Sequence, residues 1–224
     1  LAEGKTDTGI IVAEGFDYDI VDGIYTPCDN LSILVTLCAD GEIRKELVAS
    51  VAEGLIMDRT KGESFERLKE VFRKKSLQMV SFTITEKGYQ LSGPDGKYFR
   101  QVEKDFDMGP DYAQSYMGMI TALCYERYKA GRLPLGLVSM DNFSHNGDRL
   151  RKAVVSIAEQ WCLKGKVERE FCEYLTDEGY VSFPITMIDK ITPRPDEEIA
   201  QILQEQGIEN LGGGGGAGGG SNVF

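Results

Sequence analysis

Histidine and paired cysteines, the usual zinc ligands, are scarce in this sequence. It has one histidine, His145, and five cysteines, none of them in a Cys-x-x-Cys pair. Structural zinc sites repeat such ligands at short spacings, so no metal site is predicted. An odd number of cysteines also argues against a disulfide framework, which favours a reducing compartment and a cytoplasmic protein.

Long apolar runs and an excess of positive charge are also missing. No apolar stretch approaches membrane-spanning length, and residues 1–9 carry acids where a secretory signal would have an apolar core. The chain has 25 Lys and Arg against 36 Asp and Glu, a formal net charge of −11. Nucleic acids and anionic membranes attract cationic surfaces, so neither is predicted as a partner. A small anionic ligand remains possible, because it needs only a few local cations.

The glycine motif that marks a dinucleotide site is absent. Such folds normally begin with a strand, a Gly-x-Gly-x-x-Gly turn and a helix, and no stretch of the chain fits that pattern. Glycine is instead concentrated in residues 212–220, which read Gly-Gly-Gly-Gly-Gly-Ala-Gly-Gly-Gly. The composition of residues 212–224 is that of a flexible linker. Alternatively, the glycines are a placeholder that stands for residues whose side chains are not known.

The apolar pattern along the chain predicts alternating strands and helices. Strands are expected over 9–13, 31–38, 42–51, 77–85 and 135–138, and helices over 64–75, 112–129, 147–163, 167–175 and 197–206. Strands that alternate with helices form an α/β fold with a mainly parallel sheet. The turn signal Ala39-Asp40-Gly41 joins two of the strands, so residues 31–51 are predicted to form an antiparallel hairpin.

The most informative segment is 138–147, which reads Val-Ser-Met-Asp-Asn-Phe-Ser-His-Asn-Gly. It lies between a predicted buried strand and a predicted helix. A strand therefore delivers Asp141, Asn142 and Asn146 into a strand-to-helix loop, and open α/β sheets bind ligands at that edge. Asp and Asn are also preferred helix caps, so the residues alone leave capping and ligand binding both open.

A second segment, 181–195, reads Val-Ser-Phe-Pro-Ile-Thr-Met-Ile-Asp-Lys-Ile-Thr-Pro-Arg-Pro. Together with the first segment and with Thr-Ile-Thr-Glu-Lys-Gly-Tyr at 83–89, it resembles the mannitol dehydrogenase family. That family groups polyol dehydrogenases with mannonate and altronate oxidoreductases. Positions that match its signature are Phe183, Thr186, Asp189, Ile191 and Pro193. Lys190 replaces the usual arginine, which keeps the charge but loses the planar fork of donors.

The resemblance implies a Rossmann-like, NAD-binding domain over residues 1–195 that starts beyond the glycine-rich turn. Residues 196–211 would begin a helical substrate domain that the sequence lacks, together with its catalytic lysine, so the chain alone is expected to be inactive. The implied reaction interconverts a secondary alcohol and a ketone on a linear sugar acid or polyol. D-mannonate and D-fructuronate are favoured. A mannitol or other polyol dehydrogenase and a non-catalytic nucleotide-binding module are the alternatives.

The resemblance also assigns roles to individual residues. Asn142 matches a family asparagine whose amide donates to the substrate oxygen and stabilises the forming alkoxide. Asp189 matches an aspartate beside the nicotinamide end of the cofactor, with a cap or salt bridge as the alternative. Lys190 is a candidate partner of the substrate carboxylate or of an acid. Asp141 is expected to orient the loop, and Asn146 to serve as turn and cap with a possible reach to the substrate.

Three further residues are candidates for binding the cofactor. Glu14 and Asp17 follow a predicted strand, where an acid can hold ribose hydroxyls and repel a 2′-phosphate, which favours NAD over NADP. A solvated acidic loop explains them equally well. Thr83 ends another strand, although strand propensity accounts for it almost as well. Tyr25 is expected to pack, and His145 either to pack or to support the site residues from behind.

Overall fold

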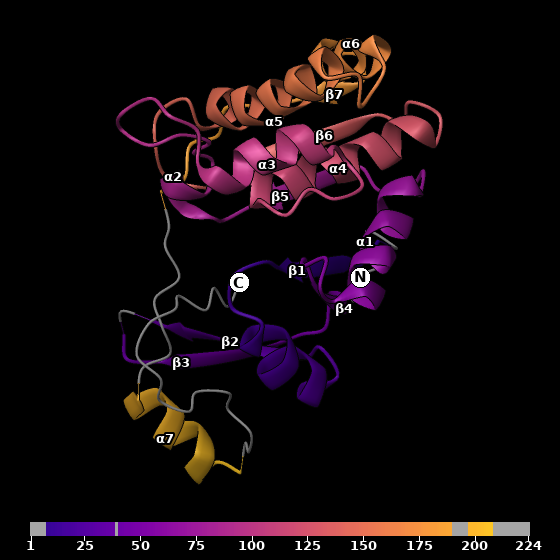
Figure 1. Cartoon of the computed structure of the whole chain (residues 1–224). Coiled ribbons are helices and arrows are strands. Elements are labelled where there is room, and N and C mark those ends of the chain that lie inside the picture. The colour runs from indigo at the N-terminus through magenta and orange to yellow at the C-terminus, as the bar shows by residue number, and fades with distance from the viewer. Residues whose placement is uncertain (1–7, 39, 190–196, 208–224) are drawn as a thin grey trace. The chain divides into compact units, whose positions relative to one another are not determined.

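A computed structural model describes residues 8–38, 40–189 and 197–207 (Figure 1). The chain divides into two compact units, one made of Leu1–Ile56 with Lys190–Phe224 and the other of Met57–Asp189. Within the described ranges, every helix is too short or too polar to span a bilayer.

The first unit holds two strand pairs of opposite sense. β1 (Ile10–Glu14) pairs in parallel with β4 (Val51–Ile56), and β2 (Ser32–Leu37) pairs antiparallel with β3 (Ile43–Val48). The predicted hairpin is therefore confirmed. The unit also contains helical turns at Val21–Tyr25 and Thr26–Cys28 and the helix α7 (Glu197–Glu205). Tyr25 is buried, as predicted.

β4 was not anticipated from the sequence. The strand predicted over 42–51 ends at Val48, and the chain then continues into β4, a strand of the other pair. Glu53 and Gly54 interrupt its apolar run, which hides the strand pattern. Gly54 has a packing reason, because a Cβ there would lie 3.3 Å from a Val21 methyl and 3.5 Å from the Tyr25 Cβ. A glycine within a strand often marks such a close approach.

The second unit is built on a three-stranded parallel sheet in the order β5-β6-β7. These strands are β5 (Met79–Phe82), β6 (Leu135–Ser139) and β7 (Val181–Ser182). The helices are α1 (Gly62–Arg73), α2 (Thr85–Gly88), α3 (Arg100–Met108), α4 (Tyr116–Lys129), α5 (Asn146–Leu163) and α6 (Arg169–Thr176). α1 packs on α4, α4 on α5 and α5 on α6 (Figure 1). Large apolar side chains of α4, α5 and α6, such as Leu123, Trp161 and Phe171, are nearly inaccessible to solvent.

The start of α4 lies later than the sequence predicted because a buried acid fixes the loop before it. Asp105 of α3 is 1% exposed and accepts from the backbone N–H groups of Gln114 at 2.9 Å and Ser115 at 2.7 Å. Residues 112–115 thus form a cap, and the helix predicted over 112–129 begins at Tyr116. α3 itself was missed because its charged sequence is typical of a solvated loop.

Arg127 anchors the amino end of the sheet. Its guanidinium is buried and donates to the backbone carbonyls of Phe72 at 2.8 Å, Lys74 at 2.9 Å and Pro134 at 2.6 Å. These bonds join the end of α1 to the loop that enters β6. A rigid amino end leaves the opposite, carboxyl edge as the place where loops can be arranged for function.

Candidate active site at the carboxyl edge of the parallel sheet

The carboxyl edge of the β5-β6-β7 sheet brings together most of the residues predicted to be functional. Because the three strands run in parallel, the chain leaves all of them at the same edge. Thr83 follows β5, Asn142 and Asn146 follow β6, and Asp189 lies in the segment after β7. Four predicted site residues therefore belong to one edge of one unit, as the motif spacing suggested.

Asp141 joins the loop after β6 to the loop after β5. Its two carboxylate oxygens accept from the backbone N–H groups of Ile84 and Thr85, each at 3.0 Å, and one of them accepts from the Tyr89 hydroxyl at 2.6 Å. The prediction that Asp141 orients the loop is thus supported by three donors. Thr85 has φ +61°, an unfavourable backbone conformation for a β-branched residue, and the carboxylate stabilises it there.

Asn146 joins the same loop to the segment after β7. It is fully buried, and its amide nitrogen donates to the Asp141 carbonyl at 3.0 Å and to the Thr186 hydroxyl at 2.7 Å. Its amide oxygen accepts from the N–H groups of Gly147 at 2.8 Å and Thr186 at 3.0 Å. Both ends of this buried amide are thus hydrogen-bonded within the protein. Asn146 thus joins these loops as the predicted turn and cap residue, and a contact between Asn146 and the substrate stays a prediction.

Gly147 allows the start of α5 to approach the segment after β7. A Cβ at this position would lie 2.5 Å from the Pro184 carbonyl oxygen and 2.6 Å from that of Phe183. Any side chain here would push the two segments apart. The Asn-Gly pair of the motif thus fastens α5 to the loop that leads to Asp189.

Asn142 differs from its neighbours because its side chain is exposed. Its amide makes no hydrogen bond with any of the residues at 8–38, 40–189 and 197–207. The backbone on either side is held, since Asp141 is clamped and the Phe143 ring packs edge-on against Tyr89 with centroids 5.5 Å apart. An available donor on a fixed loop is what stabilisation of a developing oxyanion requires.

Thr83 and Asp189 are both exposed at this edge, one directly after β5 and the other in the irregular segment after β7. The Thr83 position is suited to a cofactor that crosses the strand ends. Lys190 falls outside the described residues.

Glu14 and Asp17 belong to the other unit, where Glu14 is the last residue of β1 and Asp17 lies in the loop after it. One Glu14 carboxylate oxygen accepts from the N–H groups of Phe16 at 2.8 Å and Asp17 at 3.2 Å, which fixes the acid at the end of its strand. Both side chains are half-buried.

His145 was predicted to pack or to support the site residues, and the structure does not show it packed in the core. Its side chain is 73% exposed, and its Nδ1 lies 2.9 Å from an Asp148 carboxylate oxygen. The residue precedes α5 with φ +58°, so the turn that starts the helix directs the ring away from the core.

Tyr89, Ser139 and Thr186 complete the network and were not singled out as site residues from the sequence. The Tyr89 hydroxyl lies 2.8 Å from Ser139 Oγ, and the Thr186 hydroxyl donates to the Ser139 carbonyl at 2.5 Å. Burial and the hydrogen bond to Asp141 raise the pKa of Tyr89 far above its ordinary value, so the phenol stays a proton donor. All three residues lie within the motif segments quoted from the sequence, and that position was the signal that could have identified them.

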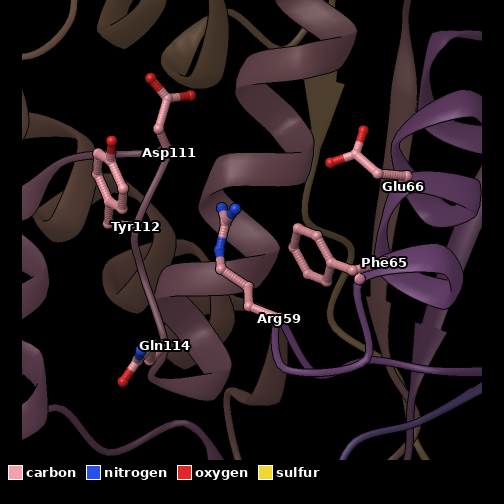
Figure 2. Close-up of a pocket in the computed structure, with 7 residues that line it drawn as sticks. Arg59, Phe65, Glu66, Asp111, Tyr112 and Gln114 are labelled. Carbon is pink, nitrogen blue, oxygen red and sulfur yellow. The ribbon is translucent and has the colours of Figure 1, made fainter.

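A hollow of about 260 Å³ lies away from this network, next to the start of α1 (Figure 2). Its central cation, Arg59, lies 4.4 Å from the centroid of the Phe65 ring and donates to the carbonyls of Pro110 and Ala113. The lining side chains Glu66 and Asp111 are acidic. Arg59 is thus engaged by the protein itself, and none of the predicted site residues lines the hollow.

Among the residues that the structure describes, one group of possible metal ligands lies at the turn of the β2–β3 hairpin. Ligand atoms of Cys38, Asp40 and Glu42 lie within 4.8 Å of one another. The Glu42 carboxylate pairs with Arg44 at 2.9 Å, and Asp40 accepts from the Glu42 N–H at 3.0 Å. Both acids thus have protein partners, and we assign no metal site.

Comparison with known proteins places the chain in a family. The family model described as the mannitol dehydrogenase Rossmann domain matches residues 12–209. The D-mannonate oxidoreductase of Thermotoga maritima is 50% identical over 211 residues, which cover 94% of this chain and 39% of that protein. The mannitol 2-dehydrogenase of Pyrenophora tritici-repentis is 27% identical over 190 residues, 82% of this chain and 31% of that protein. The chain thus spans less than half the length of these relatives.

Two solved structures share the fold. A substrate-free D-sorbitol dehydrogenase has a TM-score of 0.71 at 23% identity, and the match covers 88% of this chain and 40% of that one. The Pseudomonas fluorescens mannitol 2-dehydrogenase, solved as a ternary complex with NAD and D-mannitol, has a TM-score of 0.68 at 23% identity. The match covers 92% of this chain and 47% of that one. The prediction of a Rossmann-like α/β fold is confirmed. With its motifs at the carboxyl edge of a parallel sheet, the chain belongs to the mannitol dehydrogenase family.

Proposed function

We propose that this chain is the nucleotide-binding part of an NAD-dependent oxidoreductase that interconverts a secondary alcohol and a ketone on a linear sugar acid. The observation that carries the proposal is the exposed amide of Asn142, which lies between two fixed residues at the carboxyl edge of the parallel sheet. A relative with 50% identity, the D-mannonate oxidoreductase, supports D-mannonate and D-fructuronate as the substrate pair.

The part of Asn142 follows from its chemistry. A neutral amide can donate Nδ2–H to the oxygen of the carbon that is oxidised or reduced. Negative charge on that oxygen grows toward the transition state, so the hydrogen bond strengthens as the reaction proceeds. Because the amide carries no charge of its own, it assists both directions. The proton must leave to a base that we do not place among the described residues.

The residues at the strand ends fit NAD. The cofactor supplies the hydride acceptor when it is bound. Thr83 is exposed where the chain leaves β5, and Asp189 is exposed in the segment after β7. The Glu14 carboxylate, fixed by two N–H groups at the end of β1, suits a ribose with two free hydroxyls and repels a 2′-phosphate. These features support NAD over NADP.

A sugar acid, in contrast to a neutral polyol, requires a cation for its carboxylate. We propose Lys190 for that contact. A mannitol or other polyol dehydrogenase is the second candidate function, since such enzymes are among the relatives.

The five cysteines are all free, which supports a cytoplasmic location.

The test is a substrate panel with the whole gene product, followed by the absorbance of the reduced nicotinamide. We expect NAD reduction with D-mannonate and NADH oxidation with D-fructuronate. Turnover of only mannitol and fructose would favour the polyol dehydrogenase. Tight NAD binding without turnover of any polyol or aldonate would favour a non-catalytic nucleotide-binding module.

A further inference from the structure

Tyr89 is a buried phenol that the reaction above does not use. It is 4% exposed, although it lies just after the short helix α2 at the edge of the sheet. A tyrosine that is this buried needs partners for its hydroxyl. It has two, the Asp141 carboxylate at 2.6 Å and Ser139 Oγ at 2.8 Å.

Tyr89 contacts the residues on both sides of Asn142. Its hydroxyl donates to Asp141, which precedes the asparagine, and its ring packs against Phe143, which follows it, at a centroid distance of 5.5 Å and an interplanar angle of 63°. One side chain therefore contacts the side chains of the residues before and after Asn142. The amide itself stays exposed.

The same hydroxyl acts on the loop after β5. It shares the Asp141 carboxylate with the N–H groups of Ile84 and Thr85. These two residues directly follow Thr83, the candidate cofactor contact. Hydrogen bonds to a carboxylate are short and strong, and in a buried network each supports the others.

We propose that Tyr89 is a positioning residue, which sets the geometry between the Asn142 amide and the loop that carries Thr83 by holding Asp141 and Phe143. This role rests on the proposed function, because it assumes that Asn142 contacts the reacting oxygen. Removing the hydroxyl should therefore slow the chemical step more than it weakens binding, since misplacement of a reacting group acts on the transition state.

Tyr89→Phe is the first variant, because it keeps the ring contact with Phe143 and removes only the hydroxyl. In the whole enzyme we expect kcat to fall about tenfold, a modest part of the loss that displacement of a reacting group can cause. The KM values for NAD and D-mannonate should stay within about twofold, since binding contacts are unchanged.

Tyr174→Phe is the matched control. Tyr174 is 3% exposed, and its hydroxyl donates to the Leu133 carbonyl at 2.6 Å, just before β6 begins and so at the opposite end of that strand. Both substitutions remove a buried phenol hydroxyl, with two hydrogen bonds at Tyr89 and one at Tyr174, so both should lower the thermal midpoint. Only Tyr89→Phe should lower kcat.

The decisive measurement is a double-mutant cycle with Asn142→Ala. If Tyr89 acts through Asn142, Tyr89→Phe should change kcat by less than about twofold in the Asn142→Ala background, because coupled residues are not additive. A full tenfold loss in that background, or equal kcat values for Tyr89→Phe and Tyr174→Phe, would overturn the positioning role and leave the proposed function standing. A wild-type enzyme without turnover would overturn both.

Ser139→Ala covers the case in which Tyr89→Phe does not fold. It removes one oxygen atom, which is the second partner of the phenol and also accepts from the Asp141 N–H at 3.4 Å. We expect kcat to fall about threefold, in keeping with the net contribution of one hydrogen bond. An unchanged kcat would count against the positioning role.

Discussion

Asn142 and Asn146 lie four residues apart, and we predict different effects on stability and on kcat when each is changed to alanine. Asn142 is exposed and unbonded among the described residues, so Asn142→Ala should leave the free energy of unfolding within about 0.5 kcal/mol of wild type. Its effect should appear in kcat, which we expect to fall about ten- to a thousandfold, the range for loss of one oxyanion donor. NAD affinity should be nearly intact.

Asn146→Ala should act on stability instead. The substitution leaves the N–H groups of Gly147 and Thr186 and the Asp141 carbonyl without the amide. Each buried polar group left unpaired costs about 1–3 kcal/mol, so we expect about 3–5 kcal/mol after partial relaxation.

Urea unfolding and steady-state kinetics on both variants of the whole enzyme test this pair of expectations. The reasoning is refuted if Asn142→Ala lowers stability as much as Asn146→Ala while keeping its kcat. That result would make Asn142 a structural cap, the alternative that the sequence left open.

Three further predictions concern the rest of the structure. Gly147→Ala should lower stability by about 1–3 kcal/mol, the cost of overpacking, because its Cβ would clash with the backbone after β7; calorimetry would show whether the midpoint falls. Glu14→Gln should improve the kcat/KM ratio for NADP over NAD by removing the repulsion of a 2′-phosphate, and an unchanged cofactor ratio would remove Glu14 from the site. The pKa of Glu126 is lowered, because its two cationic partners outweigh the effect of burial. A lowered folded-state pKa adds stability above the ordinary value of 4.5 that disappears as pH falls through the lower value, so unfolding midpoints should fall less with acid in Glu126→Gln than in wild type.

Elements with a clear period were predictable from the sequence. The helices α1, α5 and α6 and the strand β6 lie within two residues of their expected bounds. β4 and α3 were missed, since Gly54 interrupts the apolar run of one and the other is largely charged. Tertiary packing decides the local structure in both cases. In β4 the packing is around Gly54, and in α3 it is around the buried Asp105.

The sequence indicated which loops form the candidate site, but it did not indicate the hydrogen-bond partners of the residues in them. The motif indicated the edge of the sheet at which these residues lie, because strand ends and loop residues are local properties. Which of the two asparagines is exposed depends on Thr186, which is 40 residues distant in sequence from Asn146. The contact between Tyr89 and Asp141 spans 52 residues. Such long-range contacts follow from the pairing of the strands, which the sequence pattern does not specify.

The most direct test of the central claim is a crystal structure of the whole enzyme with NAD and D-mannonate, which measures where the Asn142 amide lies. The account predicts that its Nδ2 lies about 3 Å from the hydroxyl oxygen at the carbon to be oxidised, a hydrogen-bond distance, with the nicotinamide across the ends of β5 and β6. An Asn142 amide that caps α5 or faces solvent, with the substrate bound elsewhere, would contradict it.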